Sequence, residues 1–185
     1  LVRLEYYERL NFPNPYAWIQ SGNALHFRWN PEKHEIFYFV RNPLTWYESW
    51  WKYMSQDSMN WKPYGDFNKR WAWHPVSELN GLGSNDFNAF IASVIEREPG
   101  FVSKLYSTYQ HPTVSFVGKQ ESLVDDLIGM LQRLDLEFDE ERIRSFRKVN
   151  KSASTVKPEW DPSLREEMIK LEYSSMKRYG YVESP

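Results

Sequence analysis

A continuous apolar run, Ile36–Val40, constrains the fold of this chain more than any other feature of its sequence. Strands with continuous rather than alternating apolar residues are buried on both faces, as in parallel sheets covered by helices. The run ends at Arg41, and Thr45 and Glu48 then have the spacing of a capping box. We therefore expect a buried strand, followed at once by a helix that continues to about Met54.

The rest of the chain predicts further helices and one more strand. Helices are expected to begin near residues 87, 101, 122 and 142, with a second buried strand over 113–117. A last helix is expected with Asp161 as its N-cap and Pro162 at its first position, continuing to about residue 178. This order predicts an α/β fold, a parallel β-sheet flanked by helices. Ligands of such sheets bind beyond the carboxyl ends of the strands, where Arg41 and Lys119 would lie.

Length and composition exclude several classes of protein. A chain of 185 residues predicts one domain with a substantial core. A net charge of −2 argues against a nucleic-acid binder, which would usually be basic. No apolar run approaches the ~20 residues that span a bilayer, and no segment resembles a signal peptide. Together with the absence of cysteine, these features predict a cytoplasmic protein without a membrane span.

Arg41 and Ser49 are candidates for an anion site. The guanidinium offers a planar fork of donors, and the start of a helix adds backbone N–H groups and a positive dipole end. Ser49 lies in the first turns of the predicted helix, where its hydroxyl can face the same anion. The alternative is a plain strand-to-helix turn in which Pro43 starts the helix and the arginine is solvated.

A second positive feature lies near the C-terminus. From Arg142 to Lys157 there are six basic residues and no acidic one. Such a segment favours a multiply charged small anion. The alternative is a solvated helix face that balances the acidic stretch 135–141.

Tryptophan is concentrated in the first half of the chain. Eight of the nine tryptophans lie between Trp18 and Trp73. Within the long loop predicted over residues 55–84, Trp61, Trp71 and Trp73 would suit a carbohydrate or another flat acceptor. The alternative is a surface loop packed by its own aromatic side chains.

Three segments together resemble the sulfotransferase family. FYFVRNPLTWYESWW resembles the segment that binds a nucleotide 3′-phosphate, with a serine eight residues after the arginine. FVGKQESLVDDLIGMLQRLDLEFD is similar to the family's strand, "V-G-x-x-E-x-L" turn and helix. RKVNKSASTVKPEWDPSLREEMIKLEYSSMKRYGY is similar to its "V-N-x-S" loop and terminal helix. The resemblance covers residues 34–54 and 114–182 in the expected order.

The resemblance implies a P-loop NTPase-like sulfotransferase architecture and a donor, 3′-phosphoadenosine 5′-phosphosulfate, with no metal. Arg41 and Ser49 would bind the 3′-phosphate, and Lys151 and Ser152 would close over the nucleotide. The sulfuryl group would pass to a hydroxyl or amine of a small molecule or carbohydrate. His26 is the best candidate for the catalytic base, with Glu35 and Glu121 as alternatives.

One family signature has no counterpart in the sequence. The loop that holds the 5′-phosphosulfate, a Pro-Lys-x-Gly-Thr-Thr-like turn, is not found. We therefore expect residues 1–185 to form a single sulfotransferase-like domain that is N-terminally incomplete, with this loop before Leu1.

A non-catalytic nucleotide- or glycan-binding protein with the same fold is the alternative. A P-loop kinase-like enzyme is less favoured, because no Walker-type lysine or Mg²⁺-binding pattern is present.

Overall fold

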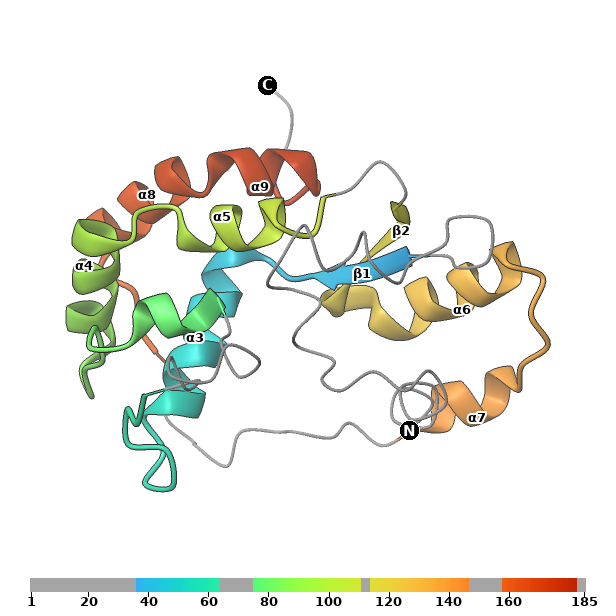
Figure 1. Cartoon of the computed structure of the whole chain (residues 1–185), viewed down its shortest axis with the longest axis horizontal. Helices are drawn as coiled ribbons and strands as arrows, with labels where there is room; N and C mark the ends of the chain where they lie inside the picture. The colour runs from blue at the N-terminus through green and yellow to red at the C-terminus, as the bar shows by residue number, and fades with distance from the viewer. Residues whose placement is uncertain (1–35, 64–74, 111–113, 147–157, 183–185) are drawn as a thin grey trace, which may run out of the picture.

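The computed structural model describes residues 36–63, 75–110, 114–146 and 158–182. These residues form a mixed α/β structure that is mostly helical (Figure 1). Its elements are β1 (Ile36–Val40), α3 (Pro43–Met54), the 3₁₀ helix η2 (Pro75–Leu79), α4 (Phe87–Arg97), α5 (Phe101–Ser107), β2 (Val114–Lys119), the 3₁₀ helix η3 (Gln120–Ser122), α6 (Leu123–Arg133), α7 (Glu140–Ser145), α8 (Pro162–Leu171) and α9 (Tyr173–Arg178).

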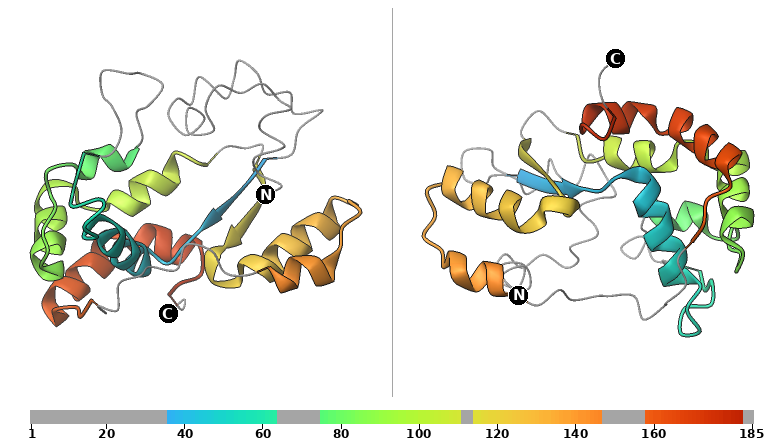
Figure 2. Two further views of the ribbon diagram at one scale, coloured as in Figure 1. Left: turned by 90° about the horizontal axis from the view of Figure 1, so that it is seen from below. Right: turned by 180° about the vertical axis from the view of Figure 1, so that it is seen from behind.

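The two strands form a parallel sheet, as the apolar runs predict. The expected burial of the strands on both faces is wrong, because Phe37 of β1 is 44% exposed and Val117 of β2 is 38% exposed, with the described helices leaving these side chains uncovered. Tyr38 pairs with Val117 and Val40 pairs with Lys119, so both strands end at the same edge. Figure 2 shows α6 and α7 on one side of the strands and the other helices on the opposite side. The carboxyl ends of both strands therefore meet where β1 enters α3.

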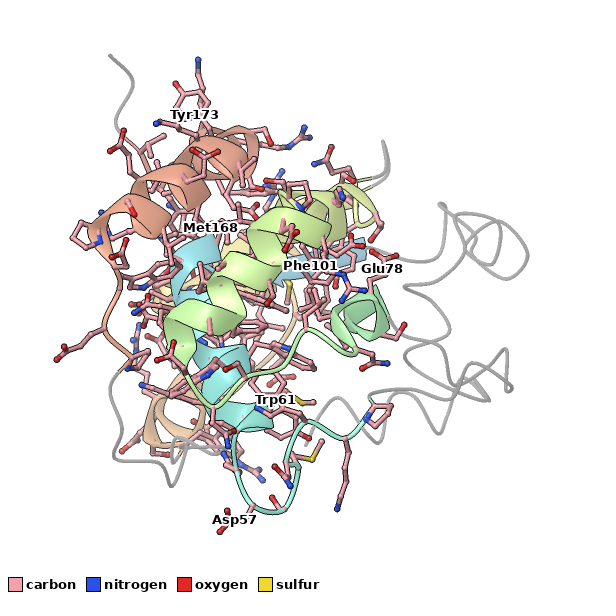
Figure 3. The ribbon with its side chains drawn as sticks, turned by 90° about the vertical axis from the view of Figure 1, so that its left-hand side faces the viewer. Asp57, Trp61, Glu78, Phe101, Met168 and Tyr173 are labelled. Atoms are coloured by element: carbon pink, nitrogen blue, oxygen red, sulfur yellow. The ribbon has the colours of Figure 1, made fainter. Side chains whose placement is uncertain are left out.

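The core lies among α3, α4, α5 and α8. Figure 3 shows this helical body, with Phe101 of α5 and Met168 of α8 labelled. The side chains that are less than 2% exposed include aromatic and aliphatic residues from all four helices: Tyr47, Phe90, Ile91, Val94, Phe101, Val102 and Met168. Because both ends of α3 pack into this core, the position of the β1–α3 turn is fixed by the helical body.

A buried carboxylate, Glu172, connects three segments of the helical body. It is 0% exposed and lies between α8 and α9. Its oxygens accept hydrogen bonds from the Tyr47 hydroxyl at 2.6 Å, from Val102 N at 3.0 Å and from Ser103 N at 2.7 Å. The two backbone donors belong to the first turn of α5, whose N-cap residue, Gly100, has no side chain to cap it. Glu172 therefore caps α5 from a distant part of the chain.

The start of α3 differs from the expected capping box. Asn42 is the N-cap, and its Oδ1 accepts from Leu44 N at 2.9 Å. Asn42 is a strong N-cap residue, and Pro43 suits the first helical position because its fixed φ is already helical. These two preferences place the start of the helix before Thr45. Its end at Met54 is as predicted.

Two C-terminal boundaries also differ from expectation. The helix expected to begin near residue 142 is Glu140–Ser145, because Asp139 caps it by accepting from Arg142 N at 2.9 Å. The last helix begins after the N-cap Asp161, as predicted, but it breaks at Glu172 into α8 and α9. The break coincides with the buried carboxylate, an interaction that local sequence patterns do not reveal.

Candidate functional site

Arg41 lies in the turn between β1 and α3, and Ser49 lies within α3. Arg41 follows the last residue of β1, and its Nε donates to Thr45 Oγ1 at 3.0 Å. Thr45 and Ser49 are four residues apart in α3 and therefore share a helix face. The guanidinium, the threonine hydroxyl and the serine hydroxyl thus form a polar row, which we call the Arg41 row. Thr45 Oγ1 accepts from Arg41 Nε and donates to Asn42 O at 3.1 Å, so the donors of this row that a ligand can use are the other guanidinium N–H groups and the Ser49 hydroxyl. Within the described residues, no ion pair joins Arg41 to a carboxylate.

The helix N-terminus contributes fewer donors than the sequence predicts. Pro43 has no N–H, and Leu44 N is already bonded to Asn42 Oδ1. Ser49 is the seventh residue of α3, so at 1.5 Å per residue it lies about 9 Å along the helix axis from Pro43. An anion at this turn therefore depends on the side chains of the Arg41 row more than on the backbone of the first turn.

Two side chains from distant segments hold the backbone of the turn. The Tyr106 hydroxyl accepts from Arg41 N at 3.0 Å and donates to Arg41 O at 2.9 Å. Glu121 Oε1 accepts from Asn42 N at 2.8 Å, and its Oε2 accepts from the Tyr181 hydroxyl at 2.9 Å. We call these two side chains, Tyr106 and Glu121, the turn clamp. Both Glu121 oxygens have donors, which argues against Glu121 as a catalytic base.

The tyrosines of this region are kept neutral. Burial raises the pKa of Tyr106 well above its ordinary value, and burial together with the Glu121 carboxylate raises the pKa of Tyr181. Burial and a hydrogen bond to Tyr179 likewise raise the pKa of Tyr38. Since an ionised phenol cannot donate, these upward pKa shifts extend the pH range over which the Tyr106 and Tyr181 hydroxyls stay donors to values above the ordinary tyrosine pKa of about 10.

Positive charge lies beside the strand ends. Lys119 Nζ is 4.9 Å from the centre of the Tyr181 ring, over its face. An open pocket of about 350 Å³ lies between the strands and α9, lined by Tyr38, Val40, Val117, Lys119, Arg178 and Tyr179. Two cations, Lys119 and Arg178, therefore line this pocket at the carboxyl ends of the strands.

Trp61, a predicted acceptor residue, is packed against the helical body. Its Nε1 donates to Asn85 Oδ1 at 3.2 Å, and its ring lies 5.2 Å from the ring of Phe90. The ring also covers Gly83 so closely that a Cβ at this glycine would be 2.3 Å from it. The role of Trp61 in acceptor binding stays a prediction.

The adjacent tryptophans of α3 face different surroundings. Trp51 is 5% exposed and donates to Ser84 O at 2.9 Å. Trp50 is half-buried and stacks on Trp46 with ring centres 5.7 Å apart, and Tyr53 continues this row at 5.9 Å from Trp50. We call Trp46, Trp50 and Tyr53 the aromatic row. Because Trp46 directly follows Thr45 and Trp50 directly follows Ser49 in α3, the aromatic row borders the Arg41 row.

Part of the basic segment is paired with acidic side chains. Arg144 binds Asp125 at 2.7 Å and Glu140 at 2.8 Å. For Arg144, these ion pairs support the alternative interpretation, in which the basic segment balances neighbouring acidic residues. Residues 147–157 lie outside the described residues, so anion binding by this part of the segment stays a prediction.

Most of the other predicted site residues also lie outside the described residues. These are the candidate base His26 and its alternative Glu35, the acceptor residues Trp71 and Trp73, and the loop residues Lys151 and Ser152. Across the residues that the structure describes, no three His, Cys, Asp or Glu side chains gather as a metal site would require. The same residues contain no helix with the length and apolar character needed to cross a membrane.

The sequence interpretation did not include Tyr106 or Glu172, and it assigned Glu121 only to a turn or to a catalytic base. Tyr106 belongs to a helix whose apolar pattern indicates packing, and it bonds Arg41 across 65 residues of chain. No spacing rule connects residues so far apart. The one available signal was the polar hydroxyl on an otherwise buried helix face.

No known protein family, curated protein or solved structure matches this chain. The choice of a function therefore depends on the chemistry of the site.

Proposed function

We propose that the Arg41 row binds the 3′-phosphate of a nucleotide. The observation that carries this proposal is the placement of Arg41 at the carboxyl end of a parallel strand, with Nε held by Thr45 and Ser49 one turn further along the same helix face. Arginine binds phosphate in a directed, often bidentate way, and hydroxyls complete such sites.

The activity that fits this site best is sulfuryl transfer from 3′-phosphoadenosine 5′-phosphosulfate, on a P-loop NTPase-like fold. The donor supplies an activated sulfuryl group, and the acceptor is a hydroxyl or amine of a small molecule or carbohydrate. His26 would take the acceptor's proton, and Trp61, Trp71 and Trp73 would orient the acceptor. As in phosphoryl transfer, the protein would contribute chiefly positioning and charge stabilisation.

Lys151 and Ser152 are proposed to close over the nucleotide, and the chain re-enters the described residues shortly after them, at Pro158. Trp160, eight residues after Ser152, donates through Nε1 to Glu48 Oε1 at 2.9 Å. Glu48 directly precedes Ser49 in α3. This contact places Trp160 beside α3, whereas Lys151 and Ser152 lie outside the described residues and their role stays a proposal.

A non-catalytic nucleotide- or glycan-binding protein is the second candidate. The aromatic row of Trp46, Trp50 and Tyr53 favours it, because aromatic faces bind sugar rings and bases without any catalytic group. Incubation with labelled donor and a panel of hydroxyl and amine acceptors separates the two candidates. Transfer of sulfate supports the enzyme, whereas nucleotide binding without transfer to any acceptor supports the binding protein.

Calorimetry with two nucleotides tests the phosphate site directly. We expect adenosine 3′,5′-bisphosphate to bind with micromolar affinity and adenosine 5′-phosphate to bind more weakly. Arg41→Ala should weaken bisphosphate binding by about 2–5 kcal/mol, the scale for truncating one partner of a buried charged pair. Arg133→Ala, at the far end of α6, removes the same charge away from the site and should leave binding unchanged. Equal binding by wild type and Arg41→Ala would refute the site.

A further inference from the structure

We infer that the turn clamp, Tyr106 and Glu121, positions the Arg41 guanidinium for its phosphate. This inference rests on the proposed nucleotide site and adds two residues to it. Neither side chain is proposed to touch the ligand. Each holds the backbone from which Arg41 extends, and each comes from a segment far from the turn in the chain, α5 for Tyr106 and η3 for Glu121.

Tyr106 fixes both polar groups of a single residue. One hydroxyl accepts from Arg41 N at 3.0 Å and donates to Arg41 O at 2.9 Å. The phenol itself is only 3% exposed, and its ring packs against Tyr109 and Tyr179 with ring centres 6.2 and 5.8 Å away. Because the ring is held by its neighbours, the hydroxyl is a fixed point for the peptide groups on both sides of Arg41.

Glu121 holds the next residue along the chain. Its carboxylate bridges Asn42 N and the Tyr181 hydroxyl, so one oxygen serves the turn and the other is held by the segment after α9. Asn42 in turn caps α3 through Leu44 N. Glu121 therefore links the strand end, the start of α3 and the C-terminal segment.

The clamp restricts Arg41 at both ends of its side chain. The backbone is held by the clamp, and Nε is held by Thr45 at 3.0 Å. An arginine side chain otherwise has several freely rotating bonds, and ordering them costs free energy when a ligand binds. A preset guanidinium avoids that cost, whereas a displacement of about 1 Å can weaken a directed contact severely.

The clamp also determines which groups the ligand can use. The backbone N–H groups of Arg41 and Asn42 already have acceptors, so they are not donors for a phosphate at this turn, which leaves the guanidinium as its main partner. The clamp should therefore raise the preference for a 3′-phosphate without affecting the rest of the nucleotide. This preference is the ratio of two dissociation constants, that of adenosine 5′-phosphate divided by that of adenosine 3′,5′-bisphosphate.

The test for Tyr106 is this ratio in two matched variants. Tyr106→Phe keeps the ring but loses both hydrogen bonds, and we expect the ratio to fall about tenfold while the affinity for adenosine 5′-phosphate stays within about twofold. Tyr109→Phe removes a hydroxyl from a neighbouring ring that, in the described part of the chain, has no hydrogen bond to the turn. It should keep the wild-type ratio.

Two variants of Glu121 separate the effect of positioning the turn from the effect of the carboxylate charge. Glu121→Gln keeps an acceptor for Asn42 N but removes a negative charge near the phosphate, so bisphosphate binding should stay equal or become tighter. Glu121→Ala removes the same charge and the acceptor, and we expect its ratio to fall about tenfold. A purely electrostatic role would instead tighten bisphosphate binding in both variants. Glu121 is exposed, so both variants should fold, and circular dichroism checks this.

The outcomes distinguish this inference from the proposed function. A wild-type protein that binds both nucleotides equally would overturn the phosphate site and the positioning role together. A wild-type preference for the bisphosphate that persists in Tyr106→Phe and in Glu121→Ala would overturn the positioning role alone.

Discussion

At the scale of single residues, Glu172 joins Tyr47 and α5 through its buried side chain, a role that no local sequence pattern predicts. Its carboxylate is fully buried, yet no cation within the described residues pairs with it. Four donors compensate for the buried charge: the Tyr47 hydroxyl, two α5 amides and the Ser103 hydroxyl at 2.6 Å. The positive end of the α5 dipole adds to them. The negative charge that burial makes costly is therefore also what holds Tyr47 and α5 in place.

Replacing Glu172 should destabilise the protein strongly. We expect Glu172→Ala to lower the free energy of unfolding by about 3–5 kcal/mol, because several buried donors lose their acceptor. Glu172→Gln keeps the volume but presents an NH₂ group to donors, so a loss of about 2 kcal/mol is expected. Urea unfolding followed by circular dichroism measures both values.

Glu166→Gln is the control for this prediction. Glu166 lies in the same C-terminal helical region, and its pair with Lys170 joins two exposed side chains. Such pairs contribute little, so its urea midpoint should match the wild type. A Glu172→Ala protein as stable as this control would contradict the structural role of the buried carboxylate.

At the scale of elements, the close contact of the two strands depends on a glycine. The Phe39 ring lies over Gly118 of β2, where a Cβ would be only 2.3 Å from the ring. The same ring faces Phe116 at 6.4 Å. A side chain at Gly118 would therefore push Phe39 out of its place on the face of the sheet.

Two glycine-to-alanine substitutions should have opposite effects on stability. Gly118→Ala should destabilise the protein by about 1–3 kcal/mol, since the ring or the strand must shift. Gly129→Ala, within α6, should stabilise it by about 0.5–1 kcal/mol, because a Cβ there meets nothing within 4 Å and alanine favours the helix. Thermal unfolding of the two variants measures the contrast. Equal midpoints for the two variants would show that Phe39 adapts without cost.

At the scale of the whole molecule, buried tyrosines couple stability to pH. Burial raises the pKa of Tyr47 and Tyr106 well above the ordinary value, and it raises the pKa of Tyr109 to about 12. The neighbouring Glu172 carboxylate adds to the shift at Tyr47. The folded state therefore retains protons that the unfolded state releases above about pH 10.

Alkaline conditions should unfold the protein cooperatively. Below pH 10 these tyrosines are protonated in both states, so their contribution to stability is fully present. As the pH rises from about 10 towards 12 the unfolded state ionises first, and each tyrosine should cost roughly 1 kcal/mol of stability by pH 11. Near-ultraviolet absorbance should show a group of tyrosinates appearing together with the loss of circular dichroism. Complete tyrosine ionisation with the fold intact would contradict this expectation.

Local features of the fold were predictable because their causes are local. The apolar run Ile36–Val40 predicted β1, and the N-cap Asp161 was identified from the sequence together with Pro162. At the start of α3, however, the capping-box interpretation failed, because two competing caps lie three residues apart and the backbone adopts the Asn42 one. The position of Arg41 at a strand end was likewise predictable from adjacent residues.

The sequence by itself determined the strand-to-helix turn that presents Arg41, since apolar continuity, proline geometry and helix capping act over a few residues. Only the tertiary structure decided what holds that turn. Tyr106 bonds Arg41 across 65 residues and Glu121 bonds Asn42 across 79, while Glu172 reaches Tyr47 across 125. Such contacts form because buried polar groups must find partners wherever packing brings them, and packing is a property of the whole chain.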